Sequence, residues 1–428
     1  MMRKAVIVGT GAGGATVARE LQGKFDVIIL ESGKPFRPFK INLSFIEHLK
    51  KTGLLFSPLE IQFFFPFMKI RKTGDNTVLV NGVGTGGTTT ISAGNAIRAD
   101  AEIRKLGINL DPEFEEIYRE IPITLEHRRL WRKTTTRLFD ICLEMKLDPK
   151  PIPKLGDYSH CVNCGQCVLG CANGAKWDSR SYLSEAVDRG ARLITNCKVK
   201  SVRIKNGKAI GVVTHKKQFI SADLVILSAG GLGTPVILEN SGIECEKNLF
   251  VDHVLTVAAE WKNCLQNKEF SMPFAVQRDN FMLSPYFDHL NFYFNNKWKY
   301  PAKDTLGIMI KLADECTGWI EKGRVNKVLT ESDKKRLNEG VAICTEIFIR
   351  LGVKKENLFL GSLNAGHPGG MLPLTASEAG TFHNKKLPDG LYVADSNLFP
   401  RSLGNPPILT IIAMAKRISK LCIEQGKT

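Results

Sequence analysis

The first thirty residues alternate between short apolar runs and a helical pattern. An apolar run at residues 5–8 leads into glycines, a helical pattern extends from about Ala12 to Leu21, and a second apolar run covers Asp26 to Leu30. Runs of β-branched residues predict buried strands, whereas apolar residues three and four positions apart predict a helix. The chain is therefore predicted to begin with a βαβ unit whose two strands are parallel.

The same two periods predict the other elements of the chain. Residues 100–150 carry apolar side chains at helical spacings, and residues 179–189 are predicted to form a further helix. Strands are predicted at residues 192–195, 199–204, 209–214, 222–228 and 390–395, and a last helix at residues 408–422.

A glycine-rich turn separates the first strand from the first helix. Gly9, Gly11 and Gly14 have the spacing G-x-G-x-x-G, with Ala12 and Gly13 inside it. In dinucleotide-binding folds the first glycine permits the turn, the second lets the backbone approach a pyrophosphate, and the third lets the helix pack on the strand. The N-terminus of the helix then faces the negative charge of the pyrophosphate. We therefore predict that this turn binds a dinucleotide.

An acidic residue follows the predicted βαβ unit. Glu31 ends the second strand, where an acidic residue accepts hydrogen bonds from a ribose hydroxyl group.

The remainder of the pattern predicts how the chain is divided into domains. Residues 251–385 lack the βαβ rhythm and are rich in aromatic residues. We expect an α/β Rossmann-type FAD/NAD(P)-binding domain at residues 1–250 and 386–428. It is interleaved with an α+β substrate domain at residues 251–385, built on a mainly antiparallel sheet.

The glycine motif does not choose between NAD and FAD, but three later segments bear on the choice. They are a second glycine loop at Asn81–Thr89, the strand end at Ala229–Pro235 and the C-terminal segment Asp395–Pro400. In this order, with Gly174-Ala175-Lys176 between them, they resemble the glucose-methanol-choline (GMC) oxidoreductases, which are FAD enzymes acting on alcohols. The resemblance covers the whole chain, although Gly-Gly-Thr stands where the family usually has Gly-Gly-Ser and the chain is shorter than most members.

The resemblance implies an FAD site and a small-molecule alcohol as substrate. The adenine end of the flavin would lie on Glu31, and the isoalloxazine ring near residues 84–95 and the C-terminal segment. Beyond the first glycine loop and Glu31, the implied cofactor-binding residues are Gly84, Gly86, Gly87, Thr88, Asn95, Val199, Ala229, Gly230, Asp395, Asn405 and Pro406.

A histidine in a glycine-rich turn is the candidate catalytic base. Alcohol oxidation by a flavin needs a base for the hydroxyl proton while hydride leaves carbon, and histidine titrates near neutral pH. His367 lies in Asn364–Gly370, where glycines can bring a side chain close to a planar cofactor. The resemblance places a second catalytic residue at Asn405, whose neutral amide would orient the hydroxyl group. The alternative is structural: His367 satisfies the turn, and Asn405 caps the helix that follows.

The other histidines do not supply a second candidate base. Five of them lie in polar or charged surroundings and are predicted to be surface residues rather than ligands: His48, His127, His215, His289 and His383. His253 resembles a family position near the flavin and is not assigned a catalytic role.

Four cysteines crowd into one short stretch. Cys161, Cys164, Cys167 and Cys171 have the C-x2-C-x2-C-x3-C spacing of bacterial ferredoxins, which predicts an iron–sulfur cluster of the 4Fe-4S or 3Fe-4S type. The fourth ligand is left open, because the last cysteine of such a run usually serves a different cluster and Ala172 replaces the usual proline. The segment is similar to one in long-chain alcohol oxidases, which implies no cluster, and to one in cluster-bearing sugar dehydrogenases of the family. A structural loop or a zinc site is the alternative.

The chain is basic, with 59 Lys and Arg against 43 Asp and Glu and a net charge of +16. The basic residues are scattered and no basic run is interleaved with aromatic residues, so no nucleic-acid partner is expected. The charge favours an acidic ferredoxin, or a lipid headgroup near a quinone pool. Eleven cysteines without a disulfide framework, and no apolar signal core, predict a cytoplasmic protein. The apolar segment at residues 53–68, flanked by basic residues, suits contact with the cytoplasmic face of a membrane rather than a crossing.

Together these features predict an FAD-dependent oxidoreductase that acts on a CH–OH group by hydride transfer. Electrons would leave through the iron–sulfur cluster to a ferredoxin or a quinone. The apolar segment favours a lipophilic alcohol, and a sugar or polyol is equally allowed. Two other classes stay open: a flavin and iron–sulfur reductase of an isoprenoid or carbonyl substrate, and a non-catalytic flavin electron carrier, in which His367 and Asn405 would be dispensable.

Overall fold

The computed structural model of the protein describes residues 2–39, 46–48, 50, 62, 65–295 and 297–425. Most of the apolar segment that the sequence associates with a membrane, residues 53–64 apart from Gln62, lies outside the described residues. In the described part of the chain no helix combines the length and the apolar character that a membrane crossing requires.

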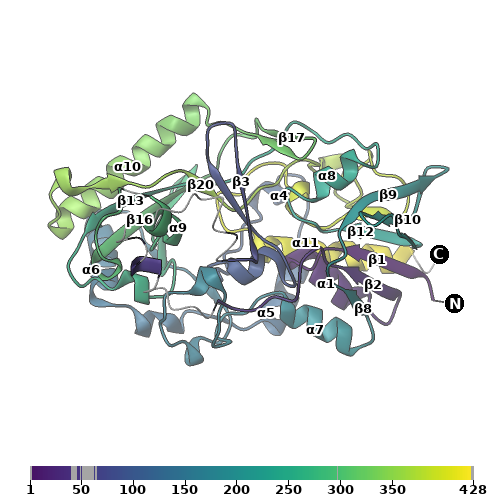
Figure 1. Cartoon of the computed structure of the whole chain (residues 1–428), viewed down its shortest axis with the longest axis horizontal. Coiled ribbons are helices and arrows are strands. Elements are labelled where there is room, and N and C mark those ends of the chain that lie inside the picture. The colour runs from purple at the N-terminus through teal and green to yellow at the C-terminus, as the bar shows by residue number, and fades with distance from the viewer. Residues whose placement is uncertain are drawn as a thin grey trace.

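Short and mostly buried strands form a five-stranded parallel sheet at the right-hand end of Figure 1. Val6, in the central strand, pairs with Val225 on one side and with Ile28 on the other. Buried β-branched runs of this kind favour a parallel sheet covered on both faces. The strand order is β21 (Leu391–Val393), β12 (Leu224–Leu227), β1 (Lys4–Val8), β2 (Asp26–Leu30) and β8 (Arg192–Ile194).

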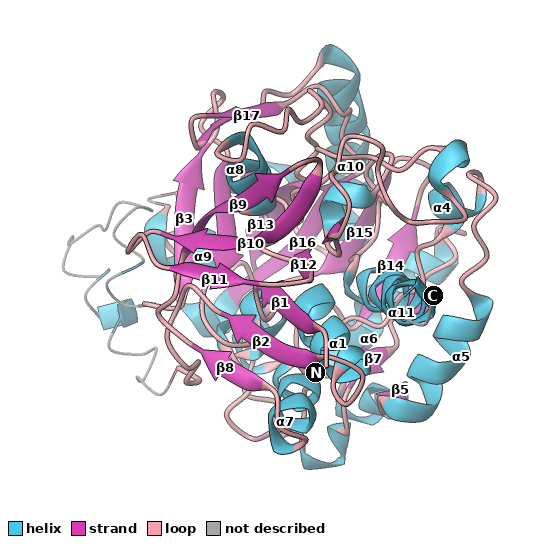
Figure 2. Cartoon of the chain, turned by 90° about the vertical axis from the view of Figure 1, so that its right-hand side faces the viewer, coloured by secondary structure: helices cyan, strands magenta, loops and turns pink. Residues whose placement is uncertain are grey.

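Helices cover one face of this sheet and a small sheet covers the other (Figure 2). α1 (Ala12–Leu21) packs on α7 (Arg180–Asp188) and on the C-terminal helix α11 (Ile408–Gln425). The small sheet is antiparallel, contacts β12, and consists of β9 (Val199–Lys205), β10 (Lys208–Thr214) and β11 (Phe219–Ser221). The helix predicted at residues 12–21 and the strand predicted at residues 26–30 are confirmed at the same bounds.

A nine-stranded sheet dominates the other end of the molecule. It runs β3 (Met68–Lys72), β4 (Val78–Gly82), β20 (Asn364–Ala365), β13 (His253–Glu260), β16 (Thr305–Leu312), β15 (Phe281–Pro285), β14 (Phe274–Gln277) and β6 (Lys150–Pro151), with β19 (Phe359–Leu360) paired to β13. Its pairings are antiparallel except for β20 with β4. α6 (Lys133–Glu144) and α10 (Glu331–Leu351) pack their buried apolar residues on it. Both parts of the predicted fold class are therefore confirmed.

Shorter elements complete the description. They are α4 (Ala101–Arg104), α5 (Asp111–Glu120), α8 (Thr234–Glu239), α9 (His289–Phe294), β5 (Ile123–Thr124), β7 (Lys154–Leu155), β17 (Trp319–Glu321), β18 (Arg324–Asn326) and 3-10 helices that include η2 (Gly87–Ile91) and η5 (Cys167–Leu169). The large sheet takes β3, β4 and β6 from the part of the chain assigned by sequence to the nucleotide-binding domain. The boundaries of the two domains stay a prediction.

Candidate active site

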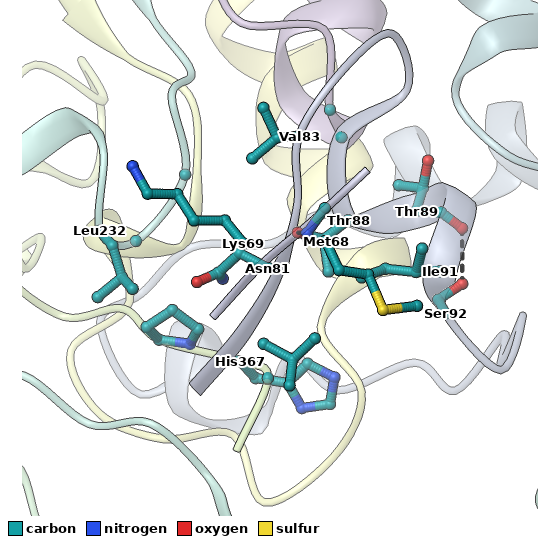
Figure 3. Close-up of a pocket in the computed structure, with 18 of the residues that line it drawn as sticks. Met68, Lys69, Asn81, Val83, Thr88, Thr89, Ile91, Ser92, Leu232 and His367 are labelled. Carbon is teal, nitrogen blue, oxygen red and sulfur yellow. Dashed lines mark hydrogen bonds between the residues drawn. The ribbon is translucent and has the colours of Figure 1, made fainter. Parts of the chain in front are cut away.

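A cavity of about 680 Å³ lies where the parallel sheet and the large sheet meet. Ligand sites commonly have roughly 300–1,000 Å³. The glycine loop after β1 and the residues after β12 form one wall, and the β3–β4 hairpin, β13 and β16 contribute others. In Figure 3 the hairpin, with Lys69 and Asn81, passes between Leu232 and the Thr88–Ser92 segment, and His367 lies below it.

The glycines of the first loop have separate roles that the packing makes visible. A Cβ atom on Gly9 would lie 2.3 Å from the Ser228 carbonyl oxygen, and one on Gly14 would lie 2.1 Å from the Gly9 carbonyl oxygen. A Cβ atom on Gly11 would meet nothing within 4 Å, and Gly11 lines the cavity. The absence of a side chain at Gly9 and Gly14 thus lets the backbone pack closely, whereas Gly11 leaves space on the cavity side. This arrangement fits the pyrophosphate of a dinucleotide.

Glu31 is held rigidly at the end of β2. It is buried, lines the cavity, and accepts hydrogen bonds from the Thr10 hydroxyl group (2.6 Å) and the Gly33 backbone N–H (2.8 Å). These contacts fix the direction of the carboxylate while leaving further lone pairs. The position therefore fits the ribose of a dinucleotide.

Asp395 holds a second backbone turn against the cavity. Its carboxylate accepts hydrogen bonds from the Gly230 N–H (3.0 Å) and the Thr234 hydroxyl group (2.6 Å). Burial raises the pKa of Asp395, and these hydrogen bonds oppose that rise. Asp395 therefore fixes the turn that follows β12 at the edge where parallel sheets bind their ligands.

The cavity brings together most of the cofactor-binding residues that the sequence predicts. Those that line it are Gly9, Gly11, Ala12, Gly13, Glu31, Gly87, Thr88, Asn95, Val199, Ala229, Gly230, Asp395 and Pro406. Gly14, Gly84, Gly86 and Asn405 are described residues that do not line it. Gly84 and Gly86 have positive φ angles of 121° and 91°, which glycine adopts readily. They therefore allow the second glycine loop to turn without lining the cavity themselves.

His367 enters the cavity from the loop after β20. Its side chain is 29% exposed, and its Nδ1 atom is buried and lies 3.3 Å from an Asp252 carboxylate oxygen, without the angles of a good hydrogen bond. Burial lowers the pKa of His367, Asp252 opposes this, and the Lys311 ammonium group adds to it. Because Nδ1 faces Asp252, Nε2 is the nitrogen left for the cavity. A neutral ring with a free Nε2 is suited to accept a proton.

Asp252 connects His367 to a buried network that the sequence did not predict. Its carboxylate forms an ion pair with Lys311 (2.5 Å) and accepts a hydrogen bond from the Ser402 hydroxyl group. Asp252 and Lys311 are both almost completely buried. Asp252 has a φ angle of 57°, a conformation that Asp tolerates better than most residues. The carboxylate is thus directed by several contacts at once.

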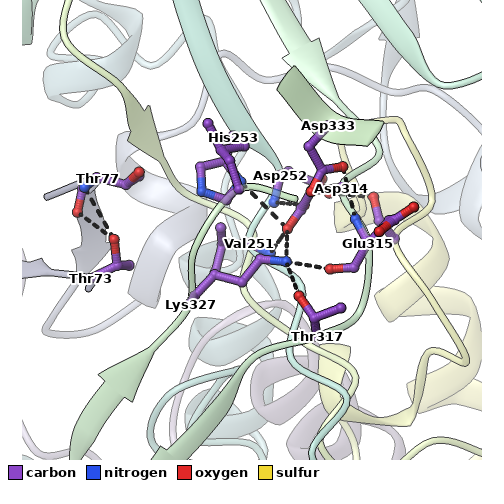
Figure 4. Close-up of polar contacts among 12 residues, drawn as sticks. Thr73, Thr77, Val251, Asp252, His253, Asp314, Glu315, Thr317, Lys327 and Asp333 are labelled. Atoms are coloured by element: carbon purple, nitrogen blue, oxygen red, sulfur yellow. Dashed lines mark hydrogen bonds and ion pairs between the residues drawn. The ribbon is translucent and has the colours of Figure 1, made fainter. Parts of the chain in front are cut away.

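A second buried carboxylate, that of Asp314, supports the backbone at Asp252 (Figure 4). Asp314 accepts hydrogen bonds from the backbone N–H groups of Val251 and Asp252 and pairs with Lys327 at 2.9 Å. Burial alone would raise the pKa of Asp314, but His253 and Lys327 lower it below its usual value. His253 is fully buried, with Nδ1 3.5 Å from Asp314, and does not line the cavity. His253 therefore acts on the site through Asp314, which holds the backbone of Asp252.

Asn405 lies in the turn before α11 and is half-buried. The two prolines that follow it, Pro406 and Pro407, line the cavity, whereas Asn405 itself does not. Its predicted role in orienting a hydroxyl group stays a prediction.

Comparison with known proteins assigns the family. The profile of the GMC oxidoreductases matches residues 4–256, more than half of the chain. The chain belongs to the GMC oxidoreductase family. The predicted resemblance and the predicted class, an FAD-dependent oxidoreductase, are therefore confirmed.

Two relatives and one solved structure illustrate what this GMC oxidoreductase is similar to. An uncharacterized protein of Methanocaldococcus jannaschii is 30% identical over 96% of this chain and 97% of its own length. A long-chain-alcohol oxidase of Arabidopsis thaliana is 22% identical over 99% of this chain and 67% of its own. The crystal structure of pyridoxine 4-oxidase from Mesorbium loti has a TM-score of 0.71 at 15% identity and covers 98% of both chains. The last similarity supports the fold alone.

Part of the cavity lining, called the apolar wall below, is formed by apolar side chains. It combines residues from the hairpin, the large sheet, α9 and the cysteine loop, where the cysteine loop means residues 161–171. Its apolar members are Phe65, Met68, Ile70, Val168, Leu169, Val254, Met272, Leu290, Phe294 and Met309. This GMC oxidoreductase therefore has room for an apolar group in the cavity that His367 also lines.

Two histidines predicted to lie on the surface are buried instead. His127 is fully buried and contacts the Ile152 carbonyl oxygen at 2.8 Å, and burial lowers its pKa to about 4. His289 lines the cavity and contacts the Gly165 carbonyl oxygen at 3.0 Å, and burial lowers its pKa to about 4 as well. The prediction was wrong because it weighed polar neighbours in sequence. The aromatic run Phe292–Phe294 after His289 was the better signal for burial.

The cysteine loop lies beside the cavity, since η5 packs against η2 and Val168 and Leu169 line the cavity. All eleven cysteines are free, and Cys164 is exposed. Burial raises the pKa of Cys161 to about 11, with smaller increases from Cys167, Cys164 and Cys171. Across the described chain no three His, Cys, Asp or Glu side chains converge as a metal site requires. The four thiols of this loop interact electrostatically, but the described structure does not arrange them as ligands of one metal site. Their number and spacing still form a donor set suited to an iron–sulfur cluster.

Proposed function

We propose that this protein oxidises an alcohol to a carbonyl compound, with His367 as the base. The supporting observation is that His367 shares one cavity with Gly11 and Glu31, while Asp252 holds its Nδ1 side. His367 takes the hydroxyl proton at Nε2, and the carbon–hydrogen bond breaks as the carbonyl group forms. FAD, when bound, supplies the acceptor for the hydride.

The residues that would hold FAD are those that line the cavity on the nucleotide-binding side. Gly11 and the N-terminus of α1 would hold the pyrophosphate, and Glu31 the adenosine ribose. Thr88 and Asn95 would lie at the flavin end, by the family resemblance. We propose Asn405 as the residue that orients the substrate hydroxyl group, acting beside Pro406 at the cavity edge.

The apolar wall supports a lipophilic alcohol as the substrate. Each methylene group moved from water to such a wall contributes about 0.8 kcal/mol. The long-chain-alcohol oxidase among the relatives agrees with this choice, although it shares only 22% of its residues with this chain. We therefore expect kcat/KM to rise about threefold to fourfold for each added methylene group until the wall is filled.

The cysteine loop is proposed to carry an iron–sulfur cluster through which electrons leave the protein. Leu169 lines the cavity while Cys164 is exposed, so the loop spans the distance between the cavity and the surface. A cluster there would serve a one-electron acceptor, an acidic ferredoxin or a quinone, and would make the protein a dehydrogenase rather than an oxidase.

The test is anaerobic mixing of the purified protein with alcohols while the flavin absorbance is followed. Primary alcohols of increasing length should bleach the flavin, and a polyol should not. His367→Ala should retain FAD and slow bleaching by about 100-fold or more, because it removes a general base. His383→Ala is the matched control, since His383 does not line the cavity. Near-normal bleaching by His367→Ala, or a protein that takes up no FAD, would exclude the proposal.

A further inference from the structure

The β3–β4 hairpin has two chemically different faces, and residues of both faces line the cavity. Successive side chains of a strand point to opposite faces. On β3, Met68 and Ile70 therefore share one face, which packs in the same apolar cluster as residues of α9. Lys69 and Arg71 share the other face, which we call the cationic face.

The cationic face is turned toward the turn that follows β12. On β4, Asn81 pairs with Lys69 and Leu79 pairs with Arg71, and residues paired across two strands lie on the same face. Leu79 packs in one apolar cluster with Leu232 of that turn. In Figure 3 the Lys69 and Asn81 side chains extend from the hairpin on the side of Leu232. The cationic face thus looks toward the nucleotide-binding side of the cavity.

A further cation approaches from the small sheet. Lys198 directly precedes β9, and its carbonyl oxygen accepts a hydrogen bond from the backbone N–H of His215, which follows β10 (2.8 Å). Both residues line the cavity. Burial lowers the pKa of Lys69, and repulsion by Arg71 and Lys198 lowers it further. Lys69, Arg71 and Lys198 therefore form one cluster of like charge.

These three side chains have few partners in the protein. Arg71 is partly buried, and among the described residues its guanidinium group, which carries five N–H donors, makes one hydrogen bond, to the Asn81 side-chain oxygen at 3.3 Å. Within the same residues none of the three cations has a carboxylate at ion-pair distance. The carboxylates that do line the cavity accept hydrogen bonds from other groups; they are those of Glu31, Asp288 and Asp395.

We infer that Lys69, Arg71 and Lys198 form a binding site for a phosphate group inside the cavity. A phosphate group carries up to about two negative charges and three acceptor oxygens, and the guanidinium fork and ammonium groups are the usual donors to it. A carboxylate would bring a single charge to three cations. The family resemblance assigns none of these three residues to a ligand.

Two molecules could bring a phosphate group to this site. One is FAD, whose diphosphate would then be held by these side chains in addition to the first glycine loop. The other is the substrate, which would then be an alcohol that carries a phosphate group; this second source rests on the proposed oxidation. The experiment has one measurement for each source.

The experiment compares the FAD-loaded wild-type protein with Lys69→Gln and Arg71→Gln. Glutamine removes the charge and keeps a hydrogen-bond donor. Lys72→Gln is the matched control, because Lys72 also lies on β3 but is exposed and does not line the cavity. Lys69→Arg keeps the charge and should behave like the wild type. The melting temperature of each protein checks its folding.

The first measurement is the rate at which FAD leaves the protein, followed by FAD fluorescence. If the phosphate group belongs to FAD, both glutamine variants should release FAD about tenfold faster than the wild type at low salt, because each has lost a charge-assisted contact. The difference should shrink at about 0.5 M salt, which screens charges. Lys72→Gln should release FAD at the wild-type rate.

The second measurement is the binding of octyl phosphate and of octanol, followed by the change each causes in the flavin spectrum. If the phosphate group belongs to the substrate, the wild type should bind octyl phosphate more tightly than octanol. Each glutamine variant should then bind octyl phosphate about tenfold more weakly and octanol as the wild type does. FAD release would be the same in all variants.

Wild-type values of both FAD release and octyl phosphate binding in the two glutamine variants would overturn the inference. So would a faster FAD release that comes with a lower melting temperature and that Lys69→Arg does not correct, since the lysine would then be structural. The proposed oxidation fails separately. A wild-type protein whose flavin no alcohol bleaches contradicts the oxidation, whereas faster FAD release from the glutamine variants would still support the phosphate site.

Discussion

His367 depends on Asp252 for its direction. The Asp252 carboxylate faces Nδ1 at 3.3 Å and is itself fixed by Lys311 and Ser402. An imidazole whose Nδ1 side faces a carboxylate keeps its proton there and leaves Nε2 free. The sequence could not reveal this, because Lys311 lies on β16 and Ser402 near the C-terminus, and only the folded chain brings them to Asp252.

Asp252→Asn tests this dependence through the pH profile of flavin bleaching. The base works in its neutral form, so the rate rises as pH increases through the pKa of His367. Asp252 raises that pKa and Lys311 lowers it, so the variant should have a still lower pKa, and the acid limb should move to lower pH. The plateau should fall by about tenfold or more, because the ring is no longer oriented. Ser402→Ala, which leaves the carboxylate in place, should keep the wild-type acid limb.

The same variant should be less stable, for a separate reason. It leaves the Lys311 ammonium group buried without an opposite charge, which costs about 3–5 kcal/mol. The double variant Asp252→Asn/Lys311→Met should recover much of the thermal stability but not the wild-type plateau. An Asp252→Asn protein with unchanged melting temperature and pH profile would show that Asp252 has no part in supporting His367.

At the scale of elements, the sequence predicts what is local and misses what is long-range. The β1–α1–β2 unit is visible because its strands, glycines and helix follow each other within thirty residues. The pairing of β4 with β20 carries no such signal, since these two strands are almost three hundred residues apart in the chain. His367 was found through its glycine-rich turn and the family resemblance, whereas Asn405 was placed by resemblance alone.

The glycine loop allows a prediction at the same scale. Gly11→Ala adds a methyl group where nothing lies within 4 Å, on the side that faces the cavity. The apoprotein should keep its melting temperature, and the affinity for FAD should fall. Gly14→Ala instead places a methyl group 2.1 Å from the Gly9 carbonyl oxygen and should destabilise the fold by about 1–3 kcal/mol. Calorimetry and FAD titration of both variants distinguish the two roles, and a common effect on folding would refute the assignment of Gly11 to the cofactor.

At the scale of the molecule, a buried ammonium group ties the C-terminal helix to the first one. Lys416 on α11 contacts Glu20 on α1 and Glu116 and Glu120 on α5 at 2.8 to 3.3 Å. Burial raises the pKa of Glu120, but Tyr182 and Lys416 lower it more, so the folded value lies below the usual 4.5. A carboxylate with a lowered folded pKa stabilises the protein above its unfolded pKa, and this stability is lost as pH falls through the folded value.

The melting temperature should therefore be nearly constant from pH 7 to pH 5 and should fall below about pH 4.5. Lys416→Met should lower the free energy of unfolding by about 1–3 kcal/mol at neutral pH. This loss is smaller than that of a fully buried ion pair, because the three carboxylates are partly exposed and water screens them. It should also flatten the acid decline, because Glu120 loses a partner that lowers its pKa. Lys334→Met, which removes an exposed pair on α10, should change stability by less than about 0.5 kcal/mol.

The net charge of +16 governs encounters with the proposed acceptor rather than the fold. Opposite charges steer an acidic ferredoxin toward a basic protein, and exposed charges are screened within about 8–10 Å at 0.1–0.15 M salt. The second-order rate constant for an acidic ferredoxin should therefore fall by about tenfold or more between 20 mM and 500 mM salt, whereas that for a neutral quinone analogue should change little. Flavin bleaching by alcohol, measured at the same salt concentrations, is the control for the reductive half-reaction. Equal salt dependence for the charged and the neutral acceptor would remove the argument for an acidic partner and leave a quinone as the better candidate.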